Sequence, residues 1–340
     1  MLACLLKGPG KVVLEEVPVP ILRRGEVLVR FRAGGICGTD LEKIQGGYGS
    51  GGILGHEVSG TVEKVSGGVK NLARGARIVA HHHVPCYVCE LCKRESYTMC
   101  ESFKATNLDP CGFTELFRVP ESNVSKGAVV PLPESVGFEE AALIEPTACC
   151  LRALRAASVQ PGHSVLVVGL GPTGLTQVQI LNDMKAGNII GSDIVKVRRE
   201  MATRLGCHTV LDPHEQEIPA EVRKEAKNGV DLAIVATGNP SAFGQAFHSV
   251  RKGGRILLFG APAQGASYDL DVSSLFSRQI SIITSYSCIE PDIHEALKLV
   301  SDGKIDLASL ITHRFQLKEA VEALKFAASS QSAVKTLIVS

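Results

Sequence analysis

Four cysteines lie close together in one short segment, at Cys86, Cys89, Cys92 and Cys100. Two-residue gaps let successive thiolates converge on one ion, and four thiolates form a closed tetrahedral zinc site. An iron–sulfur cluster is the alternative. Its bacterial motif usually has three residues between the last two cysteines and a proline after the last, whereas seven residues separate Cys92 from Cys100 here. The spacing therefore favours a structural zinc, because a closed shell leaves no position for a substrate.

A second set of metal-ligand side chains is spread over separate stretches, at Cys37, at His56 and Glu57, and at Glu145. Cysteine, histidine and carboxylate drawn from different loops hold a metal while leaving one coordination position open, as catalytic zinc requires. Taken singly, a cysteine after a strand is also typical of a buried apolar side chain, and Glu145-Pro146 of a helix start. On the residues alone these alternatives stay open.

A glycine-rich turn follows the β-branched run that begins at Val165. A strand that turns through such a motif into a helix places the helix N-terminus against a diphosphate. Asp193 lies about 20 residues further on, where a carboxylate binds the adenosine ribose. The sequence therefore predicts a dinucleotide site made of Gly169, Gly171, Pro172, Thr173, Gly174 and Asp193.

The choice between NAD and NADP depends on the charge at the ribose. The carboxylate of Asp193 would repel a 2′-phosphate and bind the free hydroxyl of NAD. A basic cluster of Lys196, Arg198 and Arg199 could instead accept a phosphate. An aspartate at the end of this strand normally determines the preference for NAD. We therefore expect NAD rather than NADP, with Arg198 beside the adenosine.

The elements that must position these groups fall into two patterns. Short strands between glycine and proline turns run from 11 to 118 and predict a small antiparallel barrel or sandwich, followed by a helix over 138–157. Strands and helices then alternate from 164 to 284, which predicts a parallel sheet with helices on both faces. Two helical patterns, 292–302 and 317–329, precede a last strand over 334–340.

Length and composition agree with this division. A chain of 340 residues is too long for one core, and we expect domains over 1–150 and 151–288, with 289–340 returning to the first. A net charge of +1 gives no basis for binding nucleic acid or a membrane surface. The N-terminus lacks a signal-peptide pattern, so we expect a cytoplasmic protein whose eleven cysteines are metal ligands and buried thiols.

Together these motifs resemble the zinc-containing medium-chain dehydrogenase/reductase superfamily, in its alcohol and polyol dehydrogenase group. The resemblance rests on Cys37-Gly38-Thr39-Asp40, Gly55-His56-Glu57, the four-cysteine segment, Glu145-Pro146 and the glycine turn. It implies an α/β fold in which a doubly wound Rossmann domain is inserted into a GroES-like, mostly antiparallel catalytic domain. It also implies a homo-oligomer, a tetramer or a dimer, with a catalytic and a structural zinc in each subunit.

The resemblance also implies roles for single residues. Cys37 and His56 match the first two catalytic zinc ligands, and either Glu57 or Glu145 completes the shell. Thr39 would relay the proton of the alcohol, and Glu42, which stands where the family often has histidine, would accept it. Lys335 takes the place of a basic residue that reaches the cofactor diphosphate.

The function implied is reversible, zinc-dependent hydride transfer between NAD and a secondary alcohol, polyol, sugar or hydroxy-amino acid. A metal-free quinone or enone reductase of the same superfamily, or a nucleotide-binding protein without turnover, is the alternative. The run His81-His82-His83 alternates faces of a strand, and we expect it to be a surface feature with at most one or two rings pointing into a cleft.

Overall fold

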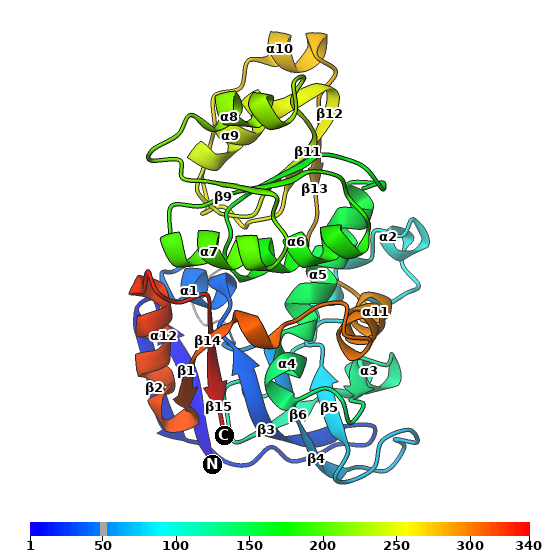
Figure 1. Ribbon diagram of the computed structural model, residues 1–340. Coiled ribbons are helices and arrows are strands. Elements are labelled where there is room, and N and C mark those ends of the chain that lie inside the picture. The colour runs from blue at the N-terminus through cyan, green and yellow to red at the C-terminus, as the bar shows by residue number, and fades with distance from the viewer. Residues whose placement is uncertain (48–52) are drawn as a thin grey trace. The chain divides into compact units, whose positions relative to one another are not determined.

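The computed structural model describes residues 1–47 and 53–340, and these form two compact units (Figure 1). Unit 1 consists of Met1–Ala148, Ser287–Gly303 and Leu307–Ser340, and unit 2 of Cys149–Tyr286 with Lys304–Asp306. The C-terminal segment thus belongs largely to the same unit as the N-terminal one. The predicted limits at 150 and 288 lie close to those of the units.

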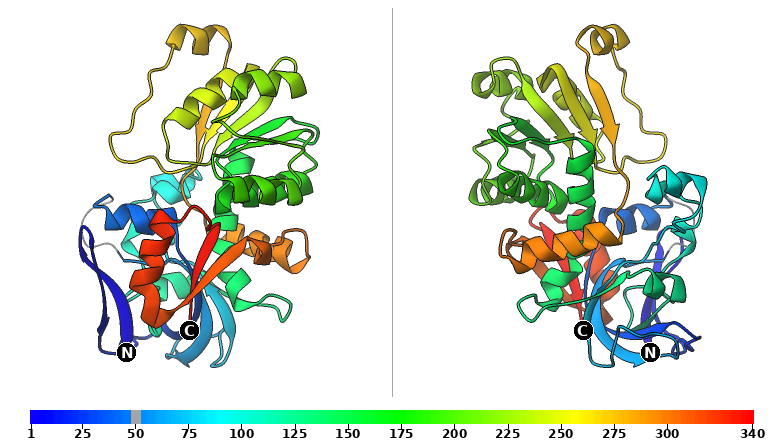
Figure 2. Two further views of the ribbon diagram at one scale, coloured as in Figure 1. Left: turned by 60° about the vertical axis from the view of Figure 1, so that its left-hand side comes forward. Right: turned by 90° about the vertical axis from the view of Figure 1, so that its right-hand side faces the viewer.

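Unit 1 is built on a seven-stranded sheet in the order β14-β15-β3-β4-β5-β7, with β6 paired to β3. The named pairs are antiparallel except β14 with β15. β1 and β2 form a separate hairpin, dark blue in Figure 2. The strands are β1 Leu2–Gly8, β2 Lys11–Glu16, β3 Val27–Gly35, β4 Glu57–Val65, β5 Arg77–Ala80, β6 Leu116–Val119, β7 Val129–Pro131, β14 Ile311–Gln316 and β15 Lys335–Val339.

The pattern of β3 shows why this sheet forms. Val29, Phe31 and Ala33 are buried while Arg30 and Arg32 between them are exposed, as expected for a strand with one face on a core. The core gathers the apolar side chains of β3, β4 and β6 with those of the last helix. The mostly antiparallel first domain is thereby confirmed.

The predicted helix over 138–157 is divided in two. α4 Phe138–Ala142 ends at Leu143, and α5 Ile144–Ala156 begins directly after it. Pro146 explains the break, because its ring nitrogen has no hydrogen to donate to the carbonyl four residues earlier. The other helices of unit 1 are α1 Gly38–Ile44, α2 Glu90–Lys93, α3 Glu121–Ser125, α11 Glu290–Ser301 and α12 Ala320–Ser329, with 3-10 turns η1 Tyr97–Met99, η2 Phe103–Ala105, η3 Ala308–Leu310 and η4 Leu317–Glu319.

Unit 2 contains a six-stranded parallel sheet in the order β10-β9-β8-β11-β12-β13. In Figure 1, α6 and α7 lie below these strands and α8 and α9 above them. This order is that of the doubly wound dinucleotide-binding fold, and it confirms the Rossmann prediction. The elements are β8 Val165–Val168, α6 Pro172–Asp183, β9 Ile189–Ser192, α7 Lys196–Arg204, β10 Thr209–Leu211, α8 Ile218–Glu225, β11 Val230–Val235, α9 Ser241–Ser249, β12 Val250–Leu258, α10 Val272–Ser277 and β13 Ser281–Thr284.

Strand β8 is central, between β9 and β11, and all four of its side chains are buried. A strand covered by helices on both faces needs such a continuous apolar run. In a doubly wound sheet the ligand binds at the carboxyl ends of the strands where the order reverses, which here is beside β8. Across the described residues, none of the helices combines the length and the apolar character needed to span a membrane.

Candidate functional site

The four cysteines predicted to bind zinc converge. Their sulfurs all lie within 4.8 Å of one another. Cys86 Sγ is 3.9 Å from Cys92 Sγ, and Cys89 Sγ is 3.8 Å from Cys100 Sγ. Four sulfurs bound tetrahedrally at about 2.3 Å from a zinc ion are about 3.8 Å apart, so the cluster fits the metal.

The backbone around this cluster favours thiolate. The amides of Val88 and Cys89 donate to Cys86 Sγ at 3.5 and 3.3 Å, and the amide of Cys86 donates to Cys100 Sγ at 3.4 Å. The first two hydrogen bonds lower the pKa of Cys86 to about 6. Since zinc binds the thiolate form, this segment is prepared for the ion.

The second ligand set is brought together by strand pairing. β3 and β4 run antiparallel with Gly35 opposite Glu57. Cys37 follows β3 and caps α1, while His56 immediately precedes β4, so residues far apart in the sequence meet at one end of the sheet. The ligand atoms of Cys37, His56 and Glu57 lie within 4.8 Å of one another. Three protein donors of these types leave a fourth position open on a zinc ion.

Asp40 holds this set in place, although its role was not predicted from the sequence. The carboxylate is completely buried and accepts hydrogen bonds from the amides of Cys37 at 3.1 Å and Gly55 at 3.0 Å. His56 Nδ1 lies 3.5 Å from its Oδ1. This arrangement leaves Nε2 of His56 as the nitrogen for a metal, which is how second-sphere carboxylates orient histidine ligands. The sequence feature that could have indicated this role is an acidic residue in the first turn of the helix that follows Cys37.

The charges of this pair reinforce each other. Burial, the largest single cause, raises the pKa of Asp40, but the charge and hydrogen bond of His56, the charge of Lys43 and the amide of Gly55 together hold this pKa below its usual value. Burial, again the largest single cause, lowers the pKa of His56, but the charges of Asp40 and Cys37 and the hydrogen bonds to both together raise this pKa well above its usual value. The carboxylate is therefore ionised at neutral pH and available to orient the imidazole.

We expect Asp40→Asn to weaken zinc binding at the Cys37 set by about 10- to 100-fold, because the amide removes the charge that orients His56. Competition against a coloured chelator measures the affinity. Asp271→Asn is the matched control, since Asp271 also accepts a backbone amide at a helix start, at 3.0 Å, but in unit 2. Equal affinity in Asp40→Asn and wild type would show that Asp40 does not orient the ligand.

Glu57 and Lys335 form a buried ion pair at the same place. Glu57 is 1% and Lys335 3% exposed, and Lys335 Nζ contacts Glu57 Oε2 and donates to the carbonyl of Ile36 at 3.0 Å. Burial, the largest single cause, lowers the pKa of Lys335, but the charge and hydrogen bond of Glu57 and the charges of Cys37 and Asp40 together leave the pKa raised. Lys335 thus holds one oxygen of Glu57, which leaves the other for a metal. Its contact with a cofactor diphosphate stays a prediction.

Gly35 makes this contact sterically possible. A Cβ atom at Gly35 would lie 2.0 Å from Glu57 Oε2. Any side chain there would therefore displace the carboxylate that reaches toward Cys37 and His56.

The predicted relay residues, Thr39 and Glu42, both lie on α1 and are partly exposed. Their roles stay predictions.

Glu145, the other candidate third ligand, belongs to a different group. Its carboxylate lies with His81 and Cys288, within the same 4.8 Å limit, and Glu57 is the carboxylate that joins Cys37 and His56.

The expectation that the histidine run is a surface feature is wrong for His81, which follows β5 directly and is completely buried. Burial lowers the pKa of His81 to about 3, so its ring is neutral. The ring of His82 lies 4.9 Å from that of His56.

The glycine turn in unit 2 has the conformation that its residues require. Gly169 has a φ of +95°, and a Cβ at Gly174 would lie 2.0 Å from the carbonyl oxygen of Gly169. Gly171 caps α6 and Pro172 occupies its first turn, followed by Thr173. These glycines let the chain pass directly from β8 into the helix, with the amides of its first turn free of intrahelical partners.

Asp193 lies beside this turn, just after β9. It is 7% exposed, and it accepts hydrogen bonds from the amides of Leu170 and Val195, both at 2.7 Å. Arg198 Nη1 is 3.9 Å from Asp193 Oδ2, whereas Arg199 pairs with Asp212 at 2.6 Å. Each residue of the basic cluster therefore has a carboxylate neighbour, and the pair of Arg199 is the shortest, since Lys196 lies 3.9 Å from Glu200.

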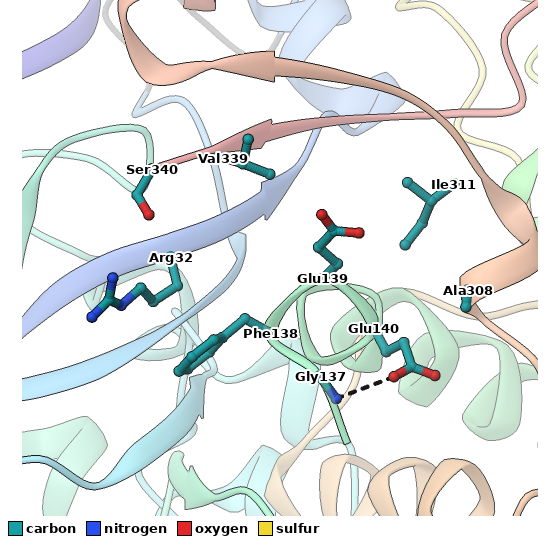
Figure 3. Close-up of a pocket in the computed structure, with 9 residues that line it drawn as sticks. All are labelled: Arg32, Gly137, Phe138, Glu139, Glu140, Ala308, Ile311, Val339 and Ser340. Atoms are coloured by element: carbon teal, nitrogen blue, oxygen red, sulfur yellow. Dashed lines mark hydrogen bonds between the residues drawn. The ribbon is translucent and has the colours of Figure 1, made fainter. Parts of the chain in front are cut away.

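A cleft of about 470 Å³ in unit 1 shares no residue with these groups (Figure 3). Its charged side chains already have partners. Arg314 binds Glu139 through both carboxylate oxygens at 2.8–3.0 Å, Glu140 accepts the amide of Gly137 at 3.1 Å, and Arg32 lies 5.8 Å from the ring of Phe138. The ligand sets above, rather than this cleft, are therefore the candidate site.

Comparison with known proteins agrees with both units. Residues 23–134 match the alcohol dehydrogenase GroES-like domain, and residues 172–302 match the zinc-binding dehydrogenase family. The chain is 30% identical to the sorbitol dehydrogenase of Bacillus subtilis (strain 168), over 96% of this chain and 93% of that protein.

Two solved structures are also similar. A zinc-binding dehydrogenase of Sinorhizobium meliloti 1021, bound to NADP, has a TM-score of 0.89 and 25% identity, covering 100% of this chain and 99% of the other. A protein from E. coli CFT073 described as a short chain alcohol dehydrogenase, in complex with NADH, has a TM-score of 0.90 and 26% identity, with coverage of 100% and 99%. From this similarity along the whole chain, together with the ligand sets and the glycine turn, we conclude that the chain belongs to the zinc-containing medium-chain dehydrogenase/reductase superfamily, as a zinc-dependent alcohol or polyol dehydrogenase that uses a nicotinamide cofactor.

Proposed function

We propose that this protein oxidises a secondary alcohol group of a polyol, sugar or hydroxy-amino acid, reversibly and with NAD, at a zinc ion held by Cys37, His56 and Glu57. The observation that carries the proposal is the convergence of these three ligand atoms, which would leave one zinc position for substrate. The sorbitol dehydrogenase relative supports the polyol class. A metal-free reductase would have no use for this ligand set.

Bound zinc supplies a Lewis acid that acidifies an alcohol hydroxyl, and bound nicotinamide supplies the hydride acceptor. Asp40 keeps the imidazole of His56 oriented, and Lys335 keeps Glu57 turned toward the metal position. The hydroxyl of Thr39 takes up the proton leaving the substrate as it releases its own, and Glu42, also on α1, receives the released proton. The second candidate for the third ligand, Glu145, stays outside the shell because its carboxylate lies with His81 and Cys288.

We propose that the diphosphate binds at Gly169, Gly171, Pro172, Thr173 and Gly174, and that Asp193 binds the ribose hydroxyls of NAD, with Arg198 flanking the adenosine. Support comes from the position of Asp193 beside the amide of Leu170, near the start of the turn. Because Arg199 is paired with Asp212, fewer cations remain for a 2′-phosphate. NADP is the less favoured cofactor.

We expect Asp193→Asn to lower kcat/KM for NAD at least ~10-fold and to raise it for NADP, because a hydrogen bond to a charged group is worth about 1.5–3 kcal/mol. Asparagine keeps only one of the two acceptor oxygens that receive the amides of Leu170 and Val195, so a thermal melt beside the kinetics checks that the turn is preserved. Steady-state kinetics with both cofactors measure the ratio. Asp183→Asn is the control for general negative charge, because Asp183 lies on α6 and pairs with Lys304 rather than with a residue of the basic cluster. An unchanged ratio in Asp193→Asn would remove this residue from cofactor choice.

The four-cysteine segment is proposed to hold a structural zinc, supported by its sulfur separations and by its amide donors. A cytoplasmic location is proposed too, because the eleven cysteines are in the reduced state, which a reducing compartment maintains.

We also propose a homo-oligomer, a dimer or a tetramer. β13 ends the sheet order of unit 2, and Ile282 on it is 38% exposed. Nearby in the chain, Val272 is 67% and Phe276 83% exposed. An uncharged, apolar edge strand is an aggregation hazard unless a partner covers it, and a second copy of the same edge is the simplest partner. Sedimentation analysis would test this.

The function is tested by following the absorbance of reduced nicotinamide while a panel of polyols, sugars and hydroxy-amino acids is offered with NAD or NADP. We expect turnover with NAD on at least one polyol. Silence across the panel would favour a binding protein without turnover. Undiminished turnover after the metals are removed would favour the metal-free reductase.

A further inference from the structure

Unit 1 contains a third group of metal-ligand side chains, outside both zinc sets. His81 follows β5, Glu145 lies in the first turn of α5, and Cys288 lies just before α11. The three are 0%, 5% and 0% exposed. One ligand atom from each lies within 4.8 Å of the other two. Three different elements thus bring a nitrogen, an oxygen and a sulfur to one buried point.

The distances within this group are close to those of a metal shell. Cys288 Sγ lies 4.0 Å from His81 Nε2 and 4.0 Å from Glu145 Oε1. Ligand atoms bound tetrahedrally at about 2.0–2.3 Å from zinc are roughly 3.3–3.8 Å apart. A small inward movement of the side chains would therefore complete the shell.

The charges also balance. A thiolate and a carboxylate together carry two negative charges, the imidazole carries none, and a divalent cation would make the buried group neutral. Binding of a divalent cation would therefore leave no net charge on these three side chains. Without a cation, the thiol keeps its proton and points it toward Glu145, whose carbonyl oxygen is 3.8 Å from Cys288 Sγ.

We propose that His81, Glu145 and Cys288 form a further binding site for a divalent cation of the zinc type. Sulfur and imidazole donors favour zinc over magnesium or calcium. On binding, the Cys288 thiol loses its proton to solvent and forms the metal–sulfur bond. The His81 Nε2 proton, which now faces the carbonyl of Cys288 at 3.2 Å, moves to Nδ1, which has no partner among the described residues. The Nε2 lone pair then binds the cation.

The site shares no residue with Cys37, His56 and Glu57, so it does not depend on the proposed catalytic role of that set. It also accounts for Glu145, which is not among the three ligands of the proposed catalytic zinc. Because all three side chains are buried, exchange of the cation should be slow, and its role would be to tie β5, α5 and the segment before α11 together.

Metal analysis of the full-length protein, dialysed to saturation against Zn²⁺, tests the proposal. We expect three equivalents per chain in the wild type and two in Cys288→Ala. Cys111→Ala is the matched control and should keep three, since Cys111 is an equally buried thiol of unit 1 outside every ligand group. His81→Gln gives a second route to the same loss if Cys288→Ala fails to fold.

A zinc-saturated crystal adds an independent reading, because anomalous scattering locates each ion. Density between His81, Glu145 and Cys288 would support the site. Its absence, with zinc present at the four cysteines and at Cys37, would overturn the proposal and leave the proposed function intact. Zinc at the third group but none at Cys37 would support this site and contradict the proposed function.

Discussion

Cys37→Ala is expected to lower kcat by about a thousandfold or more and to release one zinc equivalent per chain. Cys37 supplies the only thiolate of the Cys37, His56 and Glu57 set among the described residues. A Lewis acid contributes several kcal/mol of transition-state stabilisation, and each 1.36 kcal/mol is worth tenfold in rate. Turnover on the best polyol of the panel and the zinc content measure the two effects together.

The controls separate metal loss from misfolding. Cys4→Ala removes a completely buried thiol of the same unit that belongs to no ligand group, and it should keep both zinc and most of the turnover. Cys37→Ser keeps an oxygen donor of similar size and should recover part of the zinc but little of the rate. If Cys37→Ala loses zinc and yet turns over normally, the proposed chemistry at this ion is wrong.

The fold could be predicted where a local pattern was strong. The apolar run of β8 followed by a glycine turn identified the parallel sheet, and β4 lies within the stretch from 11 to 118 for which short strands were predicted. Shorter elements were missed. β1, β14 and α1 lack a distinctive pattern, and their formation depends on partners distant in the sequence, such as β15 for β14.

The candidate site was predictable in its residue types but not in its grouping. Sequence spacing could not decide between Glu57 and Glu145, because the decision depends on the register of β3 with β4. The same register, extended through β15 with Leu337 opposite Gly35, brings Lys335 to Glu57. His81 was misjudged because the alternation of a strand does not reveal which loops will cover its end.

Cys92→Ser is expected to have the second largest effect, on stability rather than on chemistry. Cys92 is 3% exposed and belongs to the cluster that also packs against Phe103 and Ile289. Structural zinc in small domains contributes about 10–16 kcal/mol of apparent binding free energy, so a segment deprived of one ligand should lose its ordered fold. We expect one zinc equivalent to be lost and the segment around residues 86–100 to become a target for proteolysis.

The expected pattern for Cys92→Ser is the opposite of that for Cys37→Ala. Turnover measured at low temperature soon after purification should remain, because the zinc at Cys37 is retained, while thermal inactivation becomes several times faster. Cys207→Ala, a buried thiol of unit 2, controls for the loss of a cysteine. Should Cys92→Ser keep its full zinc content and wild-type inactivation rate, the four cysteines are not a metal site. If it instead loses turnover at once with its stability unchanged, the cluster is catalytic, which a closed four-thiolate shell does not allow.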